Sequence, residues 1–208
     1  MSARINTQIP RSKFELVRDQ LGAVLLVEIG KQKQLDATLV APSVIFIERT
    51  VPFDAKSEFP AINVRYTSGA IDVSSREINQ AHYLHTYSIE VMYAAKSSTA
   101  ANGDQNASVR LQRMMGIIRS ILQSPTYNML GFTPPFAKRA WVNHMEVFES
   151  MDFQNDTNQI NGRIEYCIEL PESGMITATG APLNEITTTV TLNESDKGYF
   201  WDYNDLNA

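Results

Sequence analysis

The sequence contains one cysteine, Cys167, among its 208 residues. A single thiol cannot form a disulfide within the chain, so nothing indicates an oxidising compartment. No stretch approaches the roughly twenty consecutive apolar residues that a membrane-spanning helix requires. The first residues also lack the apolar centre of a signal peptide. These absences favour a soluble protein that is made in the cytoplasm and has no membrane partner.

Basic residues are also scarce: 18 Lys and Arg stand against 23 Asp and Glu, which gives a formal net charge of −5. Proteins that bind the outside of nucleic acid usually carry a basic stripe, and none is visible here. An acidic surface repels phosphate, which suits a passage through which DNA slides without sticking. We therefore expect no specific binding of nucleic acid.

Catalytic and cofactor-binding signatures are missing as well. No glycine-rich phosphate-binding motif occurs. His82 and His85, three apart in a predicted strand, point to opposite faces and cannot share a metal ion. Cys167 lies near Glu165 and Glu169, whose charges disfavour a thiolate, so a small strand filler is the simpler interpretation. The two glutamates are about 13 Å apart along a strand, too far for a hydrolase pair. We expect no enzyme, no cofactor and no metal.

The strongest structural signal is residues 82–93, HYLHTYSIEVMY, which contain no turn residue and are rich in β-branched and aromatic side chains. With a period of two, one face of this strand collects Tyr83, Tyr87, Ile89, Val91 and Tyr93, and the other collects His82, Leu84, Thr86, Ser88, Glu90 and Met92. A strand of this length can cross a whole sheet and pair on both sides.

Two helices are predicted. Ser12 and Glu15 match a capping box, and apolar residues at helical spacing continue from Lys13 into the region of Gly30, a plausible stop. A second helix spans residues 107–123. Its apolar stripe consists of Leu111, Met114, Met115, Ile118, Ile121 and Leu122, and its polar side carries Arg110, Arg113 and Arg119. A solvated face is the simplest interpretation of the three arginines, and a subunit interface is the alternative.

Further strands are predicted at residues 43–49, 61–66, 141–153 and 160–170, with a possible short piece at residues 71–73. The last two long strands are joined by a polar turn at residues 154–159. In residues 160–170 the inward positions are Ile160, Gly162, Ile164, Tyr166, Ile168 and Leu170, and the outward positions are Asn161, Arg163, Glu165, Cys167 and Glu169. This order predicts an α+β fold with a mostly antiparallel sheet.

The two ends of the chain differ from its centre. Residues 1–10 are expected to form a loose arm, residues 11–172 the α+β domain, and residues 173–208 an extended C-terminal interaction arm with one more strand at residues 186–192. The last residues place four aromatic side chains, Tyr199, Phe200, Trp201 and Tyr203, among acidic residues. Such a cluster is more easily explained if it docks on a domain or a neighbouring subunit.

Taken in order, the capped helix, the strand with EFPAINVRY, the strand HTYSIEVMYAA, a polar loop, the helix VRLQRMMGIIRSILQ and two final strands resemble the tail-terminator (tail-completion) proteins of tailed bacteriophages. The resemblance covers about residues 11–172 and is one of pattern, because that family has no catalytic motif.

The resemblance implies a small α+β subunit with two helices packed on one face of a sheet. It also implies a structural virion protein of the tail or neck, assembled in the host cytoplasm as a homo-hexameric ring. Such a ring caps the tail tube, ends polymerisation of the tube protein, and offers a surface to the head-side connector (stopper) protein. DNA would pass through its lumen without specific binding.

Two alternatives stay open. The chain could be another neck or tail-tube component with similar architecture. It could also be a small cytosolic α+β enzyme or ligand-binding domain, in which His82, Glu90 and His144 line a pocket across the sheet.

Overall fold

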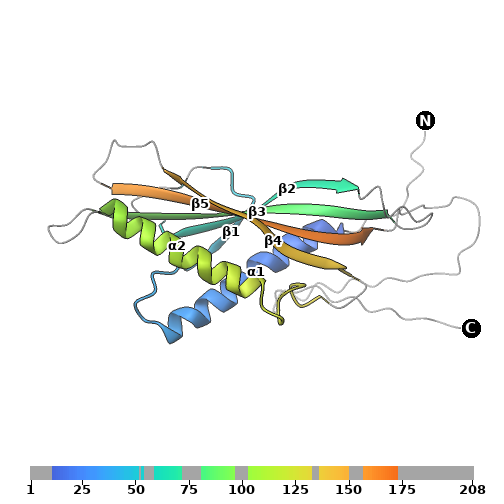
Figure 1. Cartoon of the computed structure of the whole chain (residues 1–208), viewed down its shortest axis with the longest axis horizontal. Helices are drawn as coiled ribbons and strands as arrows, with labels where there is room; N and C mark the ends of the chain where they lie inside the picture. The colour runs from blue at the N-terminus through green and yellow to red at the C-terminus, as the bar shows by residue number, and fades with distance from the viewer. Residues whose placement is uncertain are drawn as a thin grey trace, which may run out of the picture. The chain divides into compact units, whose positions relative to one another are not determined.

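Seven helices and strands make up the described part of the chain, which covers residues 11–51, 53, 59–71, 81–96, 103–132, 136–149 and 157–172 of the computed structural model. In chain order they are α1 (Lys13–Leu35), β1 (Ile45–Ile47), β2 (Ala61–Ile71), β3 (Ala81–Lys96), α2 (Gly103–Leu122), β4 (Arg139–Glu149) and β5 (Thr157–Glu172) (Figure 1). The predicted arm, the C-terminal extension and its strand at residues 186–192 lie outside the described residues, so the domain boundaries stay predictions.

The five strands form one sheet in the order β1-β2-β3-β5-β4. The central strand, β3, pairs antiparallel with β2 on one side and with β5 on the other. Its pairing with β5 is continuous from Ala81 opposite Glu172 to Lys96 opposite Thr157. β4 pairs antiparallel with β5, and only the short β1 runs parallel to its neighbour. The predicted mostly antiparallel sheet and the two-sided pairing of residues 82–93 are confirmed.

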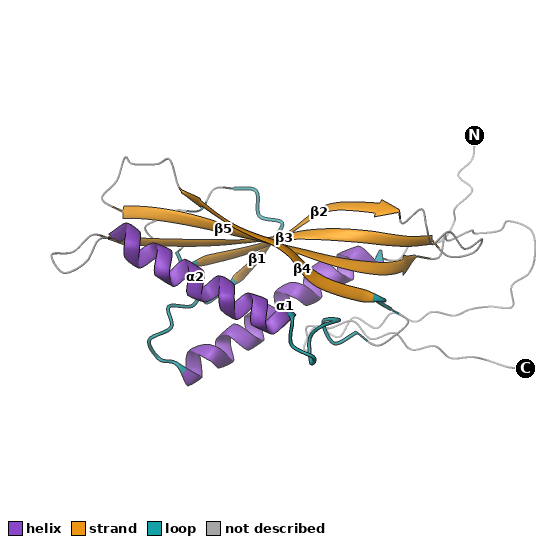
Figure 2. Ribbon diagram, in the orientation of Figure 1, coloured by secondary structure: helices purple, strands orange, loops and turns teal. Residues whose placement is uncertain are grey.

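Both helices pack on the same face of the sheet, as Figures 1 and 2 show. α1 contacts β1 and β2, and α2 contacts β3 and β5. All six apolar residues predicted for the stripe of the second helix are buried: Leu111, Met114, Met115, Ile118, Ile121 and Leu122. They meet the odd-numbered face of β3, where Tyr87, Ile89 and Val91 have no exposed surface. The two periodicities, 3.6 in the helix and 2 in the strand, therefore produce one shared core.

α1 begins as predicted and ends later than predicted. The backbone N–H of Ser12 donates to the carboxylate of Glu15 at 2.8 Å, which is the returning bond of a capping box. The helix then continues through Gly30 to Leu35, so the predicted stop at Gly30 is wrong. The residues after Gly30 are good helix formers. The helix ends at Asp36. The carboxylate of Asp36 accepts hydrogen bonds from the backbone N–H and the hydroxyl of Thr38.

β2 is one strand, whereas the sequence suggested two pieces, residues 61–66 and 71–73. In the pairing with β3, Tyr66 lies opposite Tyr87 and Ser68 lies opposite Thr86, so Thr67 is an extra residue. Such a bulge keeps both halves of a strand in the same sheet. The small residues after Tyr66 therefore mark an irregularity in pairing and not the end of the strand.

The last two strands pair as predicted, with β5 beginning three residues earlier than expected. β1 is shorter than the predicted residues 43–49, and it is followed by Glu48 at a φ of 54°, outside the strand region. In β5 the inward positions lie toward α2. At Gly162 there is no room for a side chain, because an added Cβ would lie 2.5 Å from the sulfur of Met115 and 3.3 Å from Leu111.

The close approach of β5 to α2 at Gly162 leads to a prediction about stability. Gly162→Val should lower the free energy of unfolding by about 1–3 kcal/mol, because the added atoms overpack the contact between β5 and α2. Gly116→Ala is the control, since nothing lies within 4 Å of its Cβ position on the exposed side of α2. That change should raise stability by about 1 kcal/mol. Urea unfolding followed by circular dichroism measures both, and an unchanged or more stable Gly162→Val chain would contradict the packing described.

Candidate functional site

The sheet face that the helices leave uncovered, called the open face below, carries most of the polar residues of the strands. It comprises the even-numbered positions of β3 and the residues that pair with them on neighbouring strands. Predicted outward positions Arg163 and Glu165 lie on this face. The open face is therefore the place to look for a site built from side chains on several strands.

Four charged residues of alternating sign, called the charge row below, cross the open face from β2 to β4: Arg65, Glu90, Arg163 and Glu146. Arg65 lies 3.3 Å from Glu90, and Arg163 lies 3.3 Å from Glu146. Glu90 and Arg163 occupy paired positions of β3 and β5. Opposite charges on adjacent strands stabilise a sheet by about 0.2–1 kcal/mol per pair. These pairs are partly exposed, so their main effect is to neutralise the face.

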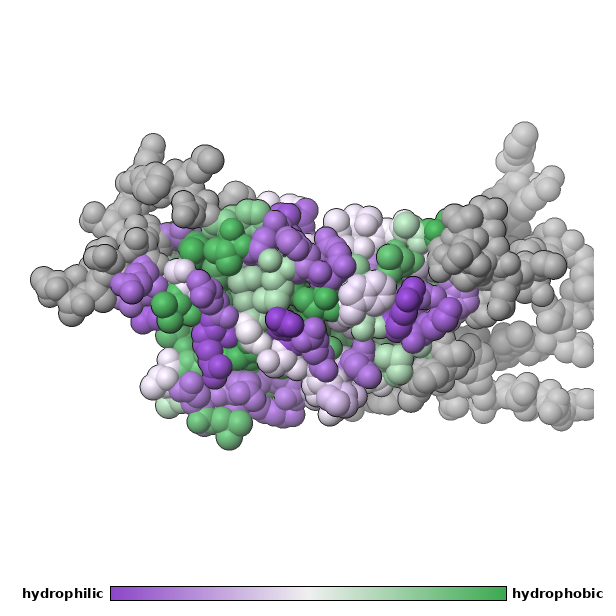
Figure 3. Space-filling model, viewed as in Figure 1, coloured by the Kyte–Doolittle hydropathy of each residue, from purple (hydrophilic) through white to green (hydrophobic). Residues whose placement is uncertain are grey.

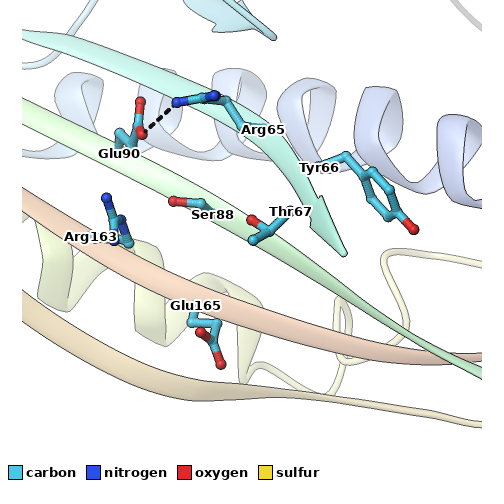
Figure 4. Close-up of a pocket in the computed structure, with 7 residues that line it drawn as sticks. All are labelled: Arg65, Tyr66, Thr67, Ser88, Glu90, Arg163 and Glu165. Carbon is cyan, nitrogen blue, oxygen red and sulfur yellow. Dashed lines mark hydrogen bonds and ion pairs between the residues drawn. The ribbon is translucent and has the colours of Figure 1, made fainter. Parts of the chain in front are cut away.

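The charge row borders a shallow hollow of about 280 Å³. Its lining consists of Arg65, Tyr66, Thr67, Ser88, Glu90, Arg163 and Glu165 (Figure 4). The amide of Asn143 donates to the Glu165 carboxylate, so that group is already engaged. The hollow offers both charges to a polar ligand, but its lining includes no histidine or cysteine.

The residues proposed for an enzymatic pocket do not come together. His82 and Glu90 are eight positions apart on β3, which is about 27 Å along a strand. His82 lies 3.3 Å from Glu169, while Glu90 pairs with Arg65. His144 is largely exposed and lies 3.8 Å from Glu146. The pocket predicted from His82, Glu90 and His144 is therefore wrong.

Glu169 was predicted to face outward, but it is buried, with only 1% of its surface exposed. Its carboxylate accepts a bond of 2.5 Å from Arg139 and lies 3.1 Å from the ammonium of Lys138. Burial raises the pKa of Glu169, but the bonds and positive charges of Lys138 and Arg139 outweigh it and hold the pKa below its ordinary value. This cluster joins the start of β4 to the end of β5.

Cys167 is buried too, with 4% of its surface exposed, although it was predicted to face outward. Its sulfur lies 3.7 Å from the hydroxyl of Thr86. Burial raises the pKa of the Cys167 thiol, and the nearby charge of Glu165 adds to this effect. A buried thiol with a raised pKa is a poor nucleophile, which agrees with its interpretation as a strand filler.

A second charged surface lies on α2, where Arg110, Arg113 and Arg119 are exposed as predicted. Among the residues that the structure describes, none of the three forms an ion pair with a carboxylate. Arg119 donates to Gln123 at 3.1 Å. Arg113 is near enough to Asp36 to contribute, after the bonds from Thr38, to the lowered pKa of that carboxylate. Their role at an interface stays a prediction.

The predicted aromatic cluster of the C-terminal segment cannot be compared with the structure. Tyr199, Phe200, Trp201 and Tyr203 are outside the described residues. Within the described ranges, no group of three or more His, Cys, Asp or Glu side chains is placed to hold a metal ion. In the same ranges, no helix is long and apolar enough to cross a membrane.

The sequence did not indicate the charge row or the hollow. Arg65, Arg163 and Glu146 come from three strands, and only the register of the sheet places them side by side. The one available signal was the presence of charged residues at alternate positions of consecutive predicted strands.

The described residues form an α+β fold with one five-stranded sheet and two helices on one face. No family model and no curated protein matches the chain. Among solved structures, a chain described as "Virion of native gene transfer agent (GTA) particle" is 13% identical, with 72% of this chain and 97% of that chain covered and a TM-score of 0.38. Similarity at this level does not extend a function from that chain to this one.

Glu169→Gln should lower the free energy of unfolding at pH 7 by about 1–3 kcal/mol, because the buried carboxylate loses its charged bonds to Lys138 and Arg139. The pKa of Glu169 is lower in the folded chain than its ordinary 4.5, so its stabilising effect is present above pH 4.5. The effect is lost as pH falls through the lowered value, and the variant and the native chain should then converge.

Urea unfolding at several pH values measures this difference. Glu146→Gln is the matched control, since its ion pair with Arg163 is partly exposed and should contribute at most about 1 kcal/mol. Equal losses for the two variants would contradict a special role for Glu169.

Cys167 should react with iodoacetamide at least about ten-fold more slowly in the folded chain than in urea, because burial hides the thiol and raises its pKa. Mass spectrometry of the alkylated chain follows the reaction. Equal rates in both conditions would show that the thiol is accessible in the folded state.

Proposed function

We propose that this chain is a structural protein of the virion of a tailed bacteriophage or a related particle. In this proposal it forms a ring, hexameric as the resemblance implies, that caps the tail tube and ends its polymerisation. The ring then joins the tail to the head-side connector protein. The observation that carries the proposal is the open face, where charges are paired across four strands.

A surface of this kind is suited to contact with other proteins. Its charged side chains are held in fixed positions by their cross-strand partners, so little conformational freedom is lost when a neighbour packs against them. Ion pairs that are already formed also attract few wrong partners. Both properties fit a protein whose task is to fit its neighbours and not to transform a substrate.

The outer edge of the sheet adds support. β4 is an eleven-residue strand that pairs with β5 on one side and with no other described strand. Near its end Val147 and Phe148 are 45% and 38% exposed. Exposed edge strands and apolar side chains are common sites of association between subunits. Figure 3 shows other hydrophobic residues in separate groups among hydrophilic ones on the face that it draws.

The element order supports the same assignment, because the two helices and five strands follow the sequence that the resemblance to tail-terminator proteins implies. The acidic balance of the chain would let DNA pass through a ring without adhering. In this proposal the partners are identical copies, the tail-tube protein and the connector protein. A neighbouring neck or tail-tube role would use the same surfaces and is the alternative.

Particles that lack this protein should have tails of irregular length, because nothing would stop polymerisation of the tube. Negative-stain electron microscopy of such particles measures the length distribution and the fraction of tails joined to heads. Particles complemented with the native chain are the control. Tails of normal length, joined to heads, would count decisively against the proposed function.

A further inference from the structure

The exposed side of α2 carries three arginines. Between Gln105 and Gln123 the only charged residues are Arg110, Arg113 and Arg119, called the arginine face below. Asp36 lies near enough to Arg113 for the two charges to interact. All three side chains are exposed. Val109, 61% exposed, adds apolar surface beside them. In a chain with a net charge of −5, this concentration of positive charge needs an explanation.

Most other arginines in the described part of the chain are paired with a carboxylate. They are Arg11, Arg18, Arg65, Arg139 and Arg163. The residues of the arginine face form no such pair with a described residue, so their charge is available to an acidic partner. Guanidinium groups suit interfaces because they bind carboxylates through two hydrogen bonds and also stack on aromatic rings.

One segment of this sequence has the complementary chemistry. Residues 193–208 contain four acidic residues, one lysine and the aromatic side chains Tyr199, Phe200, Trp201 and Tyr203. Their formal net charge is −3. Elsewhere the chain already places arginine over aromatic rings: Arg139 lies 5.2 Å from the ring centre of Trp141, and Arg163 lies 5.1 Å from that of Phe148. An acidic and aromatic segment can therefore satisfy both preferences of the arginine face.

The length of the chain after β5 allows the segment to come from another copy. Gly162 lies against Leu111 and Met115 of α2. β5 then continues ten residues to Glu172, which is about 34 Å farther along the sheet. The chain thus leaves the sheet far from the level of Arg110 and Arg113. The twenty residues from 173 to 192 can span up to about 66 Å when extended, enough to reach a neighbouring subunit.

We propose that residues 193–208 of one copy dock on the arginine face of a neighbouring copy through ion pairs and contacts between arginine and aromatic rings. This inference rests on the proposed function in one respect, namely that several copies meet in an assembly. It makes the arginine face and residues 193–208 partners of each other. It also links adjacent subunits through a segment outside their folded domains.

Cysteine cross-linking between full-length copies tests the docking. One copy carries Gln112→Cys on the exposed side of α2 and one affinity tag, and the other carries Gly198→Cys and a second tag. After co-expression, a short bismaleimide should produce a dimer that contains both tags. Thr67→Cys, exposed on the open face, replaces Gln112→Cys as the control and should yield no dimer above background. Native Cys167 is buried and stays in place.

Charge reversal makes the test specific. Arg113→Glu should reduce the yield of cross-linked dimer by about five-fold, the effect of losing about 1 kcal/mol of ion-pair energy. Asp202→Lys in the other copy should restore part of that yield. The absence of a dimer that contains both tags, an unchanged yield in Arg113→Glu, or loss of the dimer when double-stranded DNA is added before the bismaleimide would overturn the proposal.

The docking and the proposed function can fail separately. Irregular tails in particles lacking the protein, together with no dimer, would reject the docking and leave the capping function standing. A charge-dependent dimer together with normal tails would support the docking and reject the capping function.

Discussion

The structure depends on the pairing of β3 with a long strand on each side. Because β2 and β5 fix its register along its length, the alternation of its side chains separates the whole sheet into two faces. Tyr87, Ile89 and Val91 anchor the face under the helices, and Ser88 and Glu90 face the other way. A shift of one residue would exchange the two faces, so the buried aromatic and aliphatic side chains hold the register that also assembles the charge row.

The open face shows how a broad sheet accommodates polar residues without a second layer of helices. β5 lies between β3 and β4, so its outward side chains have neighbours on both sides. This lateral packing is enough to bury Cys167 and Glu169. A carboxylate in such a place must be paired, and Glu169 is held by groups at the start of β4. Toward the middle of the face the charged side chains are more exposed, and ion pairs between adjacent strands are enough to balance their charges.

Periodicity within a segment predicted the elements well, because it depends only on local geometry. The stripe of α2, the central strand and the final pair of strands follow from it. Three features depended on contacts between distant segments and were not predictable in this way: the burial of Glu169, the continuity of β2 across Thr67, and the charge row. The extension of α1 past Gly30 is a different case, since a glycine stops a helix only when the following residues favour another conformation.

The distribution of charge also separates the two candidate surfaces by what they can recognise. On the open face Arg65 and Arg163 are each offset by a glutamate 3.3 Å away, so the electrostatic potential falls off over a short distance. On α2 the three exposed arginines have the same charge, and no described carboxylate forms an ion pair with them. In the proposed assembly, long-range attraction of an acidic partner would originate at α2, whereas the open face would recognise neighbours by shape and by the register of its ion pairs. If the proposed assembly forms, one surface would attract a neighbouring copy and the other would align it.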